Sequence, residues 1–332
     1  MKKDEKGSIE RARTIFLKKG KLGYEAAKEA ILEEKFEYEP VREALAYFVG
    51  EVWHNYEHPA LLSLACESVG GDPESTTLFG ASFVLLTGAA DIHDDIIDKS
   101  KTKGSKSTVL GRYGKDMALL VGDALLVEGF TLLNHACKEL PKEQAKSTVA
   151  IVKDAFFEVG NAEAEETGLR GDWDADPEVC FSLMQRKAAI ATATTRIGAM
   201  IGGGRPEQVT ALSEYGRTMA LLANLRNEFV DIYEAGELMN RTRNECLPLP
   251  LLYAFCNQRA KNQITSLLRK KRFAAGDAAE AAKIVMETEE VISLRERMKR
   301  LAEQSIRNME VISNQEAKRI LCKLLEAMLE GL

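Results

Sequence analysis

A cluster of aspartates ends a long apolar stretch in the first third of the chain. Asp94, Asp95 and Asp98 form a D-D-x-x-D motif, and Asp91 precedes it by three residues. In a helix, spacings of four residues place two pairs of these carboxylates on shared faces, where like charges repel. Aspartate is also a mediocre helix former, and carboxylates near a helix C-terminus oppose the helix dipole. The cluster therefore needs a compensating cation.

Ligand sets made only of oxygen atoms suit a hard ion. Mg²⁺ is usually held by one or two carboxylates together with substrate phosphates. The cluster therefore predicts a magnesium–diphosphate site, with Mg²⁺ as the cofactor and Asp91 as a further candidate residue. A solvated acidic helix end is the alternative for any such motif. The apolar residues before this motif and the basic residues after it favour the metal site.

A basic stretch with interleaved glycines follows the acidic motif. Its cations are Lys99, Lys101, Lys103, Lys106 and Arg112. A cationic loop beside a metal–diphosphate site would bind phosphate oxygens through charge-assisted hydrogen bonds. We expect this role of Lys103, Lys106 and Arg112, with a solvated loop as the alternative for any single lysine.

The elements that must position these side chains are helices. Apolar residues recur at spacings of three and four along most of the chain, whereas strand patterns are nearly absent. The clearest periodic segments are Tyr24–Glu34, Glu39–His54, His58–Ser68, Ser75–Asp98, Gly114–Cys137, Lys142–Glu166, Pro177–Met200 and Pro206–Glu234. Shorter helices are expected from Pro248 onward. The glycine-rich run at 202–206 predicts a tight break between two long helices.

The composition favours one large domain. The chain has 332 residues, 45% of them hydrophobic, and no Pro-, Gly- or Ser-rich linker divides it. We therefore expect residues 1–332 to form a single all-helical domain. The formal net charge of −6 argues against a nucleic-acid partner, because such partners usually require a basic surface.

The sequence predicts a cytoplasmic location with at most peripheral membrane contact. The first seven residues are charged and carry no apolar signal segment. The apolar runs meet carboxylates before they reach membrane-spanning length. The six cysteines are scattered, without a C-x-x-C pair, and we interpret them as buried apolar residues of a reducing compartment.

Several segments together resemble the trans-isoprenyl diphosphate synthase (polyprenyl synthetase) family, of which the chain looks like a divergent member. The matching segments are the acidic motif in His93–Ser100, the Gly-Asp pair in Leu119–Leu126, Arg186 and Lys187 followed by two alanines, and the Leu-Pro run in Leu247–Ala254. They follow the family's order and spacing over about residues 50–260. Each segment alone is a weak match, but together they are specific.

The resemblance implies an all-α, isoprenoid-synthase-type bundle of long helices around a deep apolar cavity. It also implies a prenyltransferase that ionises an allylic isoprenyl diphosphate with Mg²⁺, assembled as a homodimer or as a heteromer with a related synthase. Metal ions and cations would neutralise the charge that develops on the departing diphosphate. On this interpretation Asp94 and Asp98 bind Mg²⁺. Asp95 supports them, and Lys187 contacts the diphosphate.

The family's second acidic motif is altered in this chain. Where the family has another D-D-x-x-D, this sequence has Asn227 and Asp231 four residues apart. Both would share one helix face, so the resemblance implies a weakened metal site with these two ligands. Glu228 and Asn224 are further candidates. A helix with an ordinary polar face is the alternative.

The acceptor side departs further from the family. The family's Gly-Gly-Lys-Arg-x-Arg-Pro corresponds to Trp53–Pro59, which lacks the lysine and both arginines. In the family those cations would bind the diphosphate of isopentenyl diphosphate, through charge-assisted hydrogen bonds worth about 1.5–3 kcal/mol each. A family histidine corresponds to Thr87, and a family lysine to Asn244. We therefore expect an acceptor other than isopentenyl diphosphate. His54 and His58 could contact a ligand, but a structural role is the more frequent one for such residues.

Small residues lie one helical turn before the acidic motif. In the family, bulky side chains there form a floor under the growing prenyl chain. Here the positions are Ala89 and Ala90, which leaves room for a long chain. Close helix packing is the alternative explanation.

Two other functions remain open from the sequence. One is a non-catalytic or regulatory subunit of a prenyl diphosphate synthase, which the weakened second motif favours. The other is a class I terpene cyclase, which also ionises a diphosphate without isopentenyl diphosphate. The flanking segments follow the synthase pattern and favour the prenyltransferase.

Overall fold

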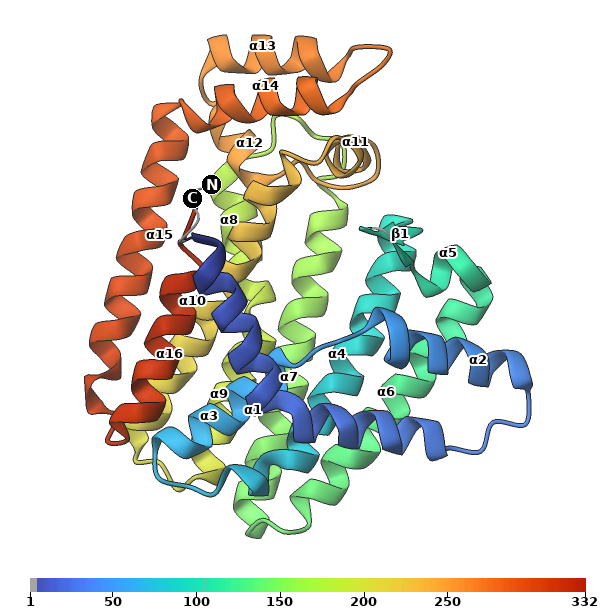
Figure 1. The fold of residues 1–332 in the computed structure, drawn as a ribbon, viewed down its shortest axis with the longest axis vertical. Coiled ribbons are helices and arrows are strands. Elements are labelled where there is room, and N and C mark those ends of the chain that lie inside the picture. The colour runs from blue at the N-terminus through green and yellow to red at the C-terminus, as the bar shows by residue number, and fades with distance from the viewer. Residues whose placement is uncertain (1–4, 105) are drawn as a thin grey trace.

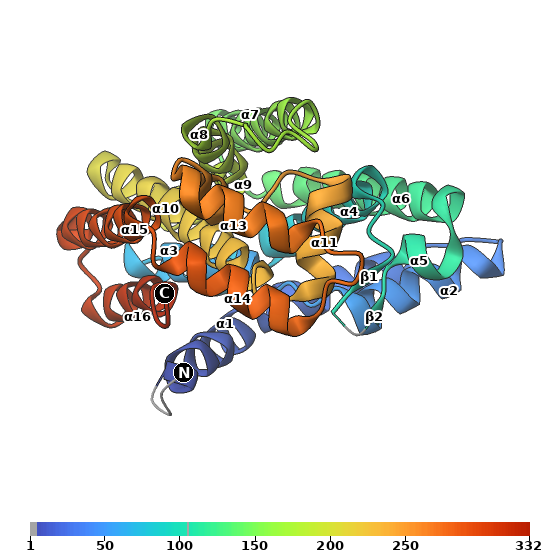
Figure 2. The same ribbon diagram turned by 90° about the horizontal axis from the view of Figure 1, so that it is seen from above.

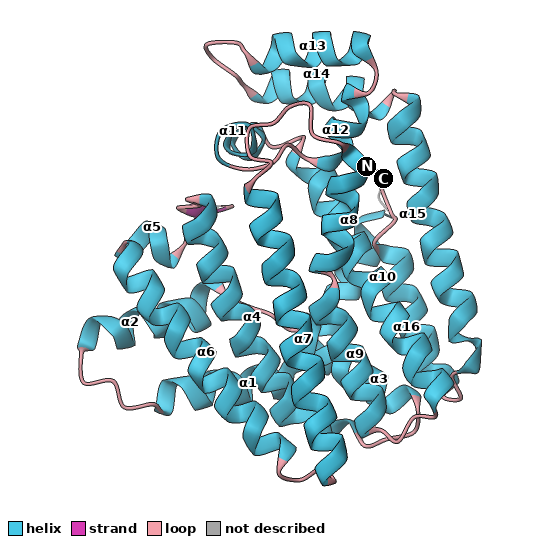
Figure 3. Ribbon diagram, turned by 180° about the vertical axis from the view of Figure 1, so that it is seen from behind, coloured by secondary structure: helices cyan, strands magenta, loops and turns pink. Residues whose placement is uncertain are grey.

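Helices make up nearly all of the fold (Figures 1 and 3), as the periodicity predicts. The computed structural model describes residues 5–104 and 106–332. In chain order the helices are α1 (Glu5–Glu33), α2 (Glu39–Tyr47), α3 (Glu57–Ser68), α4 (Thr77–Asp98), α5 (Val109–Tyr113), α6 (Lys115–Cys137), α7 (Lys142–Thr167), α8 (Pro177–Lys187), α9 (Ala189–Ile201), α10 (Pro206–Asp231), α11 (Ala235–Asn244), α12 (Leu249–Phe255), α13 (Gln258–Leu268), α14 (Ala275–Met286), α15 (Glu289–Asn308) and α16 (Gln315–Ala327).

Short elements connect the long helices. They are the π-turn η1 (Phe48–Val52), the 3-10 turns η2 (Pro73–Thr76) and η3 (Met309–Val311), and the paired strands β1 (Thr102–Lys103) and β2 (Lys106–Ser107). The two strands form a small antiparallel hairpin directly after the acidic motif, in the stretch that the sequence predicts as a loop. The expectation of an all-α fold is confirmed.

The helices α3, α4, α9 and α10 lie in the middle of the bundle. Seen from above, α7 and α8 cover one side of them and α1 lies on the opposite side (Figure 2). One apolar core joins α10, α12, α15 and α16, a second joins α1, α2, α4 and α6, and a third lies between α4, α7 and α9. The helix α4 contributes to the last two cores, which fixes its position.

Two predicted helices are each divided in the structure. The helix predicted at Glu39–His54 ends as α2 at Tyr47, and after the π-turn the backbone of Trp53 is extended. The Trp53 indole donates a hydrogen bond to the Val84 carbonyl and stacks on Phe48, contacts that hold this bend. The helix predicted at Pro177–Met200 breaks at Ala188 into α8 and α9. Local periodicity does not reveal such breaks, because tertiary contacts set them.

The helix α4 carries the acidic motif through the interior. With its 3-10 lead-in, the segment Pro73–Asp98 is long and apolar enough by composition to cross a membrane, but 72% of its most apolar window is buried inside the protein. Such burial is typical of a core helix. It ends at Asp98, after which Lys99 adopts a left-handed backbone and donates its N–H to the Asp95 carbonyl. The aspartates therefore lie in the last turns of a buried helix.

Close approach between the central helices depends on glycine. A Cβ atom at Gly198 of α9 would clash with the carbonyl oxygen of Leu62 in α3. A Cβ atom at Gly216 of α10 would clash with Thr195 and with the Ala191 carbonyl in α9. These two glycines let three helices pack backbone to backbone beneath the site.

Candidate functional site

A cavity of about 490 Å³ lies between α4, α7, α8, α9, α10 and α11. Its charged and amide side chains are Asp91, Asp94, Asp98, Glu163, Glu166, Arg170, Lys187, Asn224, Asn227, Glu228, Asp231, Arg241 and Glu245. Its apolar lining comes from Trp53, Ala90, Val159, Met184, Ile190, Ala191 and Ala220. Both acidic motifs of the sequence therefore face one cavity that also has an apolar wall.

The aspartates of the first motif do not all face the cavity. Asp94 and Asp98 line the cavity, while Asp95 is buried outside its lining, 3.0 Å from the Lys103 ammonium. Lys103 also lies 2.5 Å from Asp91. Burial raises the pKa of Asp94 to about 8, with a further contribution from Asp98. The site disfavours a free charge on Asp94, which is the electrostatic situation that a bound cation relieves.

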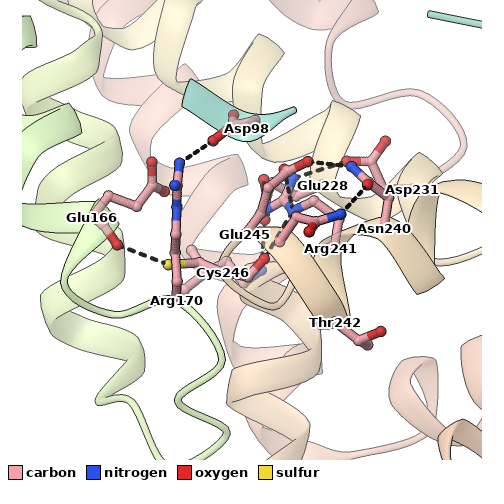
Figure 4. Close-up of polar contacts among 12 residues, drawn as sticks. Asp98, Glu166, Arg170, Glu228, Asp231, Asn240, Arg241, Thr242, Glu245 and Cys246 are labelled. Atoms are coloured by element: carbon pink, nitrogen blue, oxygen red, sulfur yellow. Dashed lines mark hydrogen bonds and ion pairs between the residues drawn. The ribbon is translucent and has the colours of Figure 1, made fainter. Parts of the chain in front are cut away.

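The second motif lies on α10 and is held by an arginine from α11. The Arg241 guanidinium is 2.7 Å from Glu228, 3.1 Å from Asp231 and 3.2 Å from Glu245 (Figure 4). Burial raises the pKa of Asp231 to about 7, although Arg241 acts against that rise. Asn227 and Asn224 line the cavity beside this cluster. All four candidates of the second motif are thus brought to the site.

Two further cations pair with carboxylates in the cavity. Lys187, at the end of α8, lies 3.0 Å from Glu163 and also pairs with Glu166 of α7. Arg170, in the segment after α7, pairs with Asp98 and donates to the Ile97 carbonyl at 3.0 Å (Figure 4). The carboxylates of three helices are therefore already linked to cations of the chain.

Five charged residues of this cavity are absent from the sequence-based candidates. They are Glu163, Glu166, Arg170, Arg241 and Glu245. A weak signal exists for Glu163 and Glu166, which are three residues apart and share a face of α7. Arg170 and Arg241 lie beyond the helices that carry the motifs, so no local pattern identifies them.

A hard divalent cation fits the chemistry of this cavity. The cavity offers carboxylate and amide oxygens on α4 and α10, which is the donor type that Mg²⁺ takes. Within residues 5–104 and 106–332, no group of three or more His, Cys, Asp or Glu side chains is close enough together to hold a metal by itself. Mg²⁺ commonly keeps waters and shares substrate phosphates. Phosphate oxygens and waters would therefore have to complete its ligand set here.

The cations of the predicted basic loop do not all lie at the same site. Lys103 and Lys106 line a second cavity of about 320 Å³, next to the first, together with His54, Asn55 and Glu57. Lys106 donates to the Glu51 carbonyl. Trp53 and Asp91 belong to the linings of both cavities.

Arg112 lies outside both cavities, contrary to the expectation that it binds diphosphate. Its guanidinium lies over the Tyr47 ring, 4.2 Å from the ring centre. The short helix α5 turns this side chain toward α2, because the hairpin reverses the chain before Arg112 is reached.

The two alanines before the motif have different surroundings. Ala90 lines the main cavity, whereas Ala89 is fully buried in the core formed by α1, α2, α4 and α6. Neighbouring helical residues point about 100° apart, and here Ala90 faces the cavity while Ala89 faces the core behind it. A direct role of Ala89 in prenyl chain length is therefore not supported.

In the altered acceptor segment, Trp53–Pro59, the side chains of Asn55 and His58 face the interior of the protein. The Asn55 side chain is buried, donates to Thr87 Oγ1 at 3.2 Å and accepts from the backbone N–H groups of Glu57 and His58. The Asn55 side chain thereby caps the N-terminus of α3. His58 lines the main cavity and contacts Thr194 through Nδ1. Neither side chain replaces the missing cations.

Comparison with known proteins matches residues 57–285 of the chain to the polyprenyl synthetase family. A short chain isoprenyl diphosphate synthase of Methanothermobacter thermautotrophicus is 29% identical over 184 residues, which are 55% of this chain and 56% of that protein. The chloroplastic geranylgeranyl pyrophosphate synthase 12 of Arabidopsis thaliana is 31% identical over 194 residues, 55% of this chain and 53% of that protein. The chain thus spans little more than half the length of these relatives.

The fold is also similar to solved structures over nearly its whole length. A geranylgeranyl pyrophosphate synthetase from Pyrococcus horikoshii superposes with a TM-score of 0.84 over 98% of this chain and 99% of that one, at 21% identity. A polyprenyl synthase from Caulobacter crescentus, solved with calcium and isoprenyl diphosphate, gives a TM-score of 0.79 over 96% of this chain and 97% of that one, at 18% identity. At this identity the likeness concerns the fold.

Proposed function

Because the chain belongs to the polyprenyl synthetase family, we propose that it is a prenyltransferase that ionises an allylic isoprenyl diphosphate with the assistance of Mg²⁺. The observation that carries this proposal is the meeting of the two acidic motifs, on α4 and α10, in one cavity with an apolar wall. The names of its relatives, which are isoprenyl diphosphate synthases, support the same class of reaction.

The polar end of the cavity binds the metal and the diphosphate. Asp94 and Asp98 on one wall, with Asn227 and Asp231 on the other, hold Mg²⁺. Asp91, Glu228 and Asn224 contribute further oxygen atoms nearby. When bound, the metal supplies positive charge that stabilises the departing diphosphate.

The chain's own cations bind the rest of the diphosphate. Lys187 and Arg170 lie in the cavity wall and pair with carboxylates there. Their ammonium and guanidinium groups donate hydrogen bonds to diphosphate oxygens. The planar guanidinium of arginine is particularly suited to this, because it can bind two phosphate oxygens at once. Lys103 holds Asp95 and Asp91 in place behind this site.

The apolar wall holds the prenyl tail and excludes water. Met184, Ile190 and Ala90 belong to it. Exclusion of water prevents capture of the allylic cation by solvent. Of the two alanines before the motif, Ala90 alone lines this wall, and its small side chain leaves room for a long prenyl tail.

We further propose that the acceptor is not isopentenyl diphosphate. The second cavity, where an acceptor would approach, is lined by Glu57 and Asp91 as well as by Lys103 and Lys106. Both lysines already have partners in the protein. Incubation with radiolabelled allylic diphosphates of increasing length, isopentenyl diphosphate and Mg²⁺ tests this part of the proposal. Efficient stepwise elongation would contradict it.

Substitution of the first motif tests the ionisation step. We expect the variant with Asp94→Ala and Asp98→Ala to release diphosphate from farnesyl diphosphate about 10²–10³-fold more slowly, because charge stabilisation in the transition state is lost. The matched control is Asp154→Ala, which removes an exposed carboxylate from α7. If the double variant retains the rate of the control, the ionisation proposal is wrong.

A regulatory subunit is the second candidate function. Arg241 neutralises Glu228 and Asp231, the two charged residues of the second motif, and this favours a site that binds metal weakly. If the purified chain releases no diphosphate but changes the product of an active family member that it binds, the regulatory function replaces the catalytic one.

A further inference from the structure

His58 is a partly buried titratable residue that ionisation of the diphosphate does not require. It lies in the first turn of α3 and lines the same cavity as Asp94 and Lys187. Its ring stacks on Phe83 of α4, with the ring centres 6.0 Å apart and an interplanar angle of 16°. The imidazole is therefore held at the apolar wall in a fixed orientation.

The hydrogen bonds around His58 determine which ring nitrogen carries the proton. Its Nδ1 lies 3.0 Å from Thr194 Oγ1. The Thr194 hydroxyl donates its one proton to the Ile190 carbonyl at 2.8 Å. A hydroxyl that has used its proton can only accept from the ring. This arrangement favours the tautomer with the proton on Nδ1, which leaves the lone pair on Nε2.

The other polar groups near His58 are already used. Thr87 Oγ1 donates to the Phe83 carbonyl at 2.6 Å and accepts from Asn55 at 3.2 Å. The Trp53 indole donates to the Val84 carbonyl. Among the described residues, the His58 ring makes its side-chain hydrogen bond through Nδ1, which leaves Nε2 without a partner. It is therefore a proton acceptor available on the apolar side of the cavity.

Burial keeps this acceptor neutral. Desolvation lowers the pKa of His58 to about 4, so the imidazole carries no charge near pH 7. A neutral base suits a carbocation, because an imidazolium would repel the cation. A weak base is also sufficient, since a proton next to a carbocation is very acidic. A carboxylate in the same place could be trapped by the cation as an ester.

From this geometry we infer that His58 is the general base that removes the proton after the allylic cation has formed, an inference that rests on the proposed function. The C1–O bond breaks, and its electron pair leaves with the diphosphate. The cation then loses a proton to Nε2 of His58. The electrons of that C–H bond form a new double bond, and the imidazolium returns its proton to solvent when the product leaves.

Farnesyl diphosphate with Mg²⁺ and no acceptor tests this inference. Diphosphate release measures ionisation, and the ratio of hydrocarbon to alcohol products measures proton removal against capture by water. We expect His58→Phe, which keeps the stacking on Phe83, to release diphosphate within about threefold of the wild-type rate. The hydrocarbon-to-alcohol ratio should fall at least about tenfold, which is less than the roughly 10²–10⁴-fold effect typical of general bases. His135→Phe, an exposed histidine on α6, is the control and should leave both values unchanged.

The outcomes separate this inference from the proposed function. If the wild type releases no diphosphate, the proposed function fails and the role of His58 fails with it. If the wild type releases diphosphate and His58→Phe leaves the product ratio unchanged, the role of His58 alone is wrong. Equal loss of release and of both products would show a structural role instead.

A spectroscopic measurement on the wild type avoids the question of whether the variant folds. Nitrogen-15 NMR of labelled histidine distinguishes the two tautomers of each ring. We expect His58 to be neutral at pH 7 with the proton on Nδ1, and Thr194→Val to abolish that preference. A proton on Nε2 would overturn the inference.

Discussion

Arg241 is the residue on which the second acidic motif depends. Its guanidinium reaches Glu228 and Asp231 of α10 and Glu245 beyond α11, and all of these side chains are largely buried. Carboxylates gathered in this way repel one another unless a cation lies between them. The arginine therefore joins α10 to α11 as well as lining the cavity.

Removal of Arg241 should destabilise the protein strongly. Loss of one partner from a buried ion pair usually lowers the free energy of unfolding by about 3–5 kcal/mol, and we expect a loss of this size for Arg241→Met. Denaturant unfolding without added metal measures it. Arg243→Met, two residues away and exposed, is the matched control and should change stability by less than about 0.5 kcal/mol. Equal effects of the two substitutions would contradict a structural role for the Arg241 cluster.

His58 should give the protein a characteristic pH dependence. Its pKa falls from an ordinary value of 6.5 to about 4 on folding, so the unfolded chain binds its proton more readily. Its contribution to the free energy of unfolding is therefore complete above pH 6.5 and decreases as the pH falls toward 4. We expect wild type to lose stability relative to His58→Phe over this range, with His135→Phe following wild type. Parallel pH profiles for wild type and His58→Phe would refute this.

At the residue scale, sequence patterns identify side chains that a single helix brings together. Asp94 with Asp98, and Asn227 with Asp231, share a face because of their spacing, and both pairs do line the cavity. The same patterns miss Arg170 and Arg241, whose places depend on where one helix ends and another packs. They do not indicate that Arg112 lies outside both cavities, because a two-strand hairpin redirects the chain after α4.

At the element scale, the crossing of α9 with its neighbours sets the shape of the site. The residues Ile190 and Ala191 of α9 line the cavity, and Thr194 one turn later holds His58. The break at Ala188 leaves Lys187 at the end of α8, with its ammonium in the cavity. Periodicity predicts the helices themselves, but it does not predict this break, because Ala188 is compatible with a continuous helix.

Substitution of Gly198 should reveal how tightly α9 packs on α3. We expect Gly198→Ala to lower the free energy of unfolding by about 1–3 kcal/mol, because the new methyl group meets the Leu62 backbone and the helices must separate. Gly160→Ala on α7 is the matched control. That site has open space around it, so the exchange should stabilise the helix by about 0.5–1 kcal/mol. If Gly198→Ala also stabilises the protein, the close approach is not a constraint.

At the scale of the whole molecule, α6 presents an apolar face that the described residues of this chain do not cover. Leu120 is 57% exposed, Val127 is 67% exposed and Phe130 is 42% exposed, and their spacing places them along one side of the helix. Contiguous exposed apolar residues commonly mark contact surfaces. We propose that a second copy of the chain packs on this face, in keeping with the homodimer that the family resemblance implies beside a heteromer with a related synthase.

Light scattering on the purified protein tests the proposed dimer. A single chain has a mass of 36.7 kDa, so we expect a particle of twice that mass. The variant with Leu120→Glu and Val127→Glu should be monomeric, because the charges cannot be buried in the interface. Leu22→Glu, at an exposed position on α1, is the control and should leave the mass unchanged. A wild-type monomer that gains mass only when mixed with a family relative would indicate a heteromer instead.

The overall fold is the part that sequence reasoning predicts most completely. Long apolar periodicities outweigh local irregularities, so the helical class and most boundaries of the long helices from α3 to α10 follow from them. The start of α1 is missed, because its first half alternates between charged and apolar residues without a clear face. The packing of α7 and α8 across the site is not predictable from patterns within either helix (Figure 2).

The charge of the main cavity has a consequence for the order in which ligands arrive. Its lining carries eight carboxylates but only three cations, Arg170, Lys187 and Arg241. A diphosphate that enters first meets an excess of negative charge and is repelled. The cavity would instead attract a metal ion, and an ion held by Asp98 would release Arg170 from that carboxylate to receive the substrate. We therefore expect ordered binding, in which the divalent ion binds first and the prenyl diphosphate binds second.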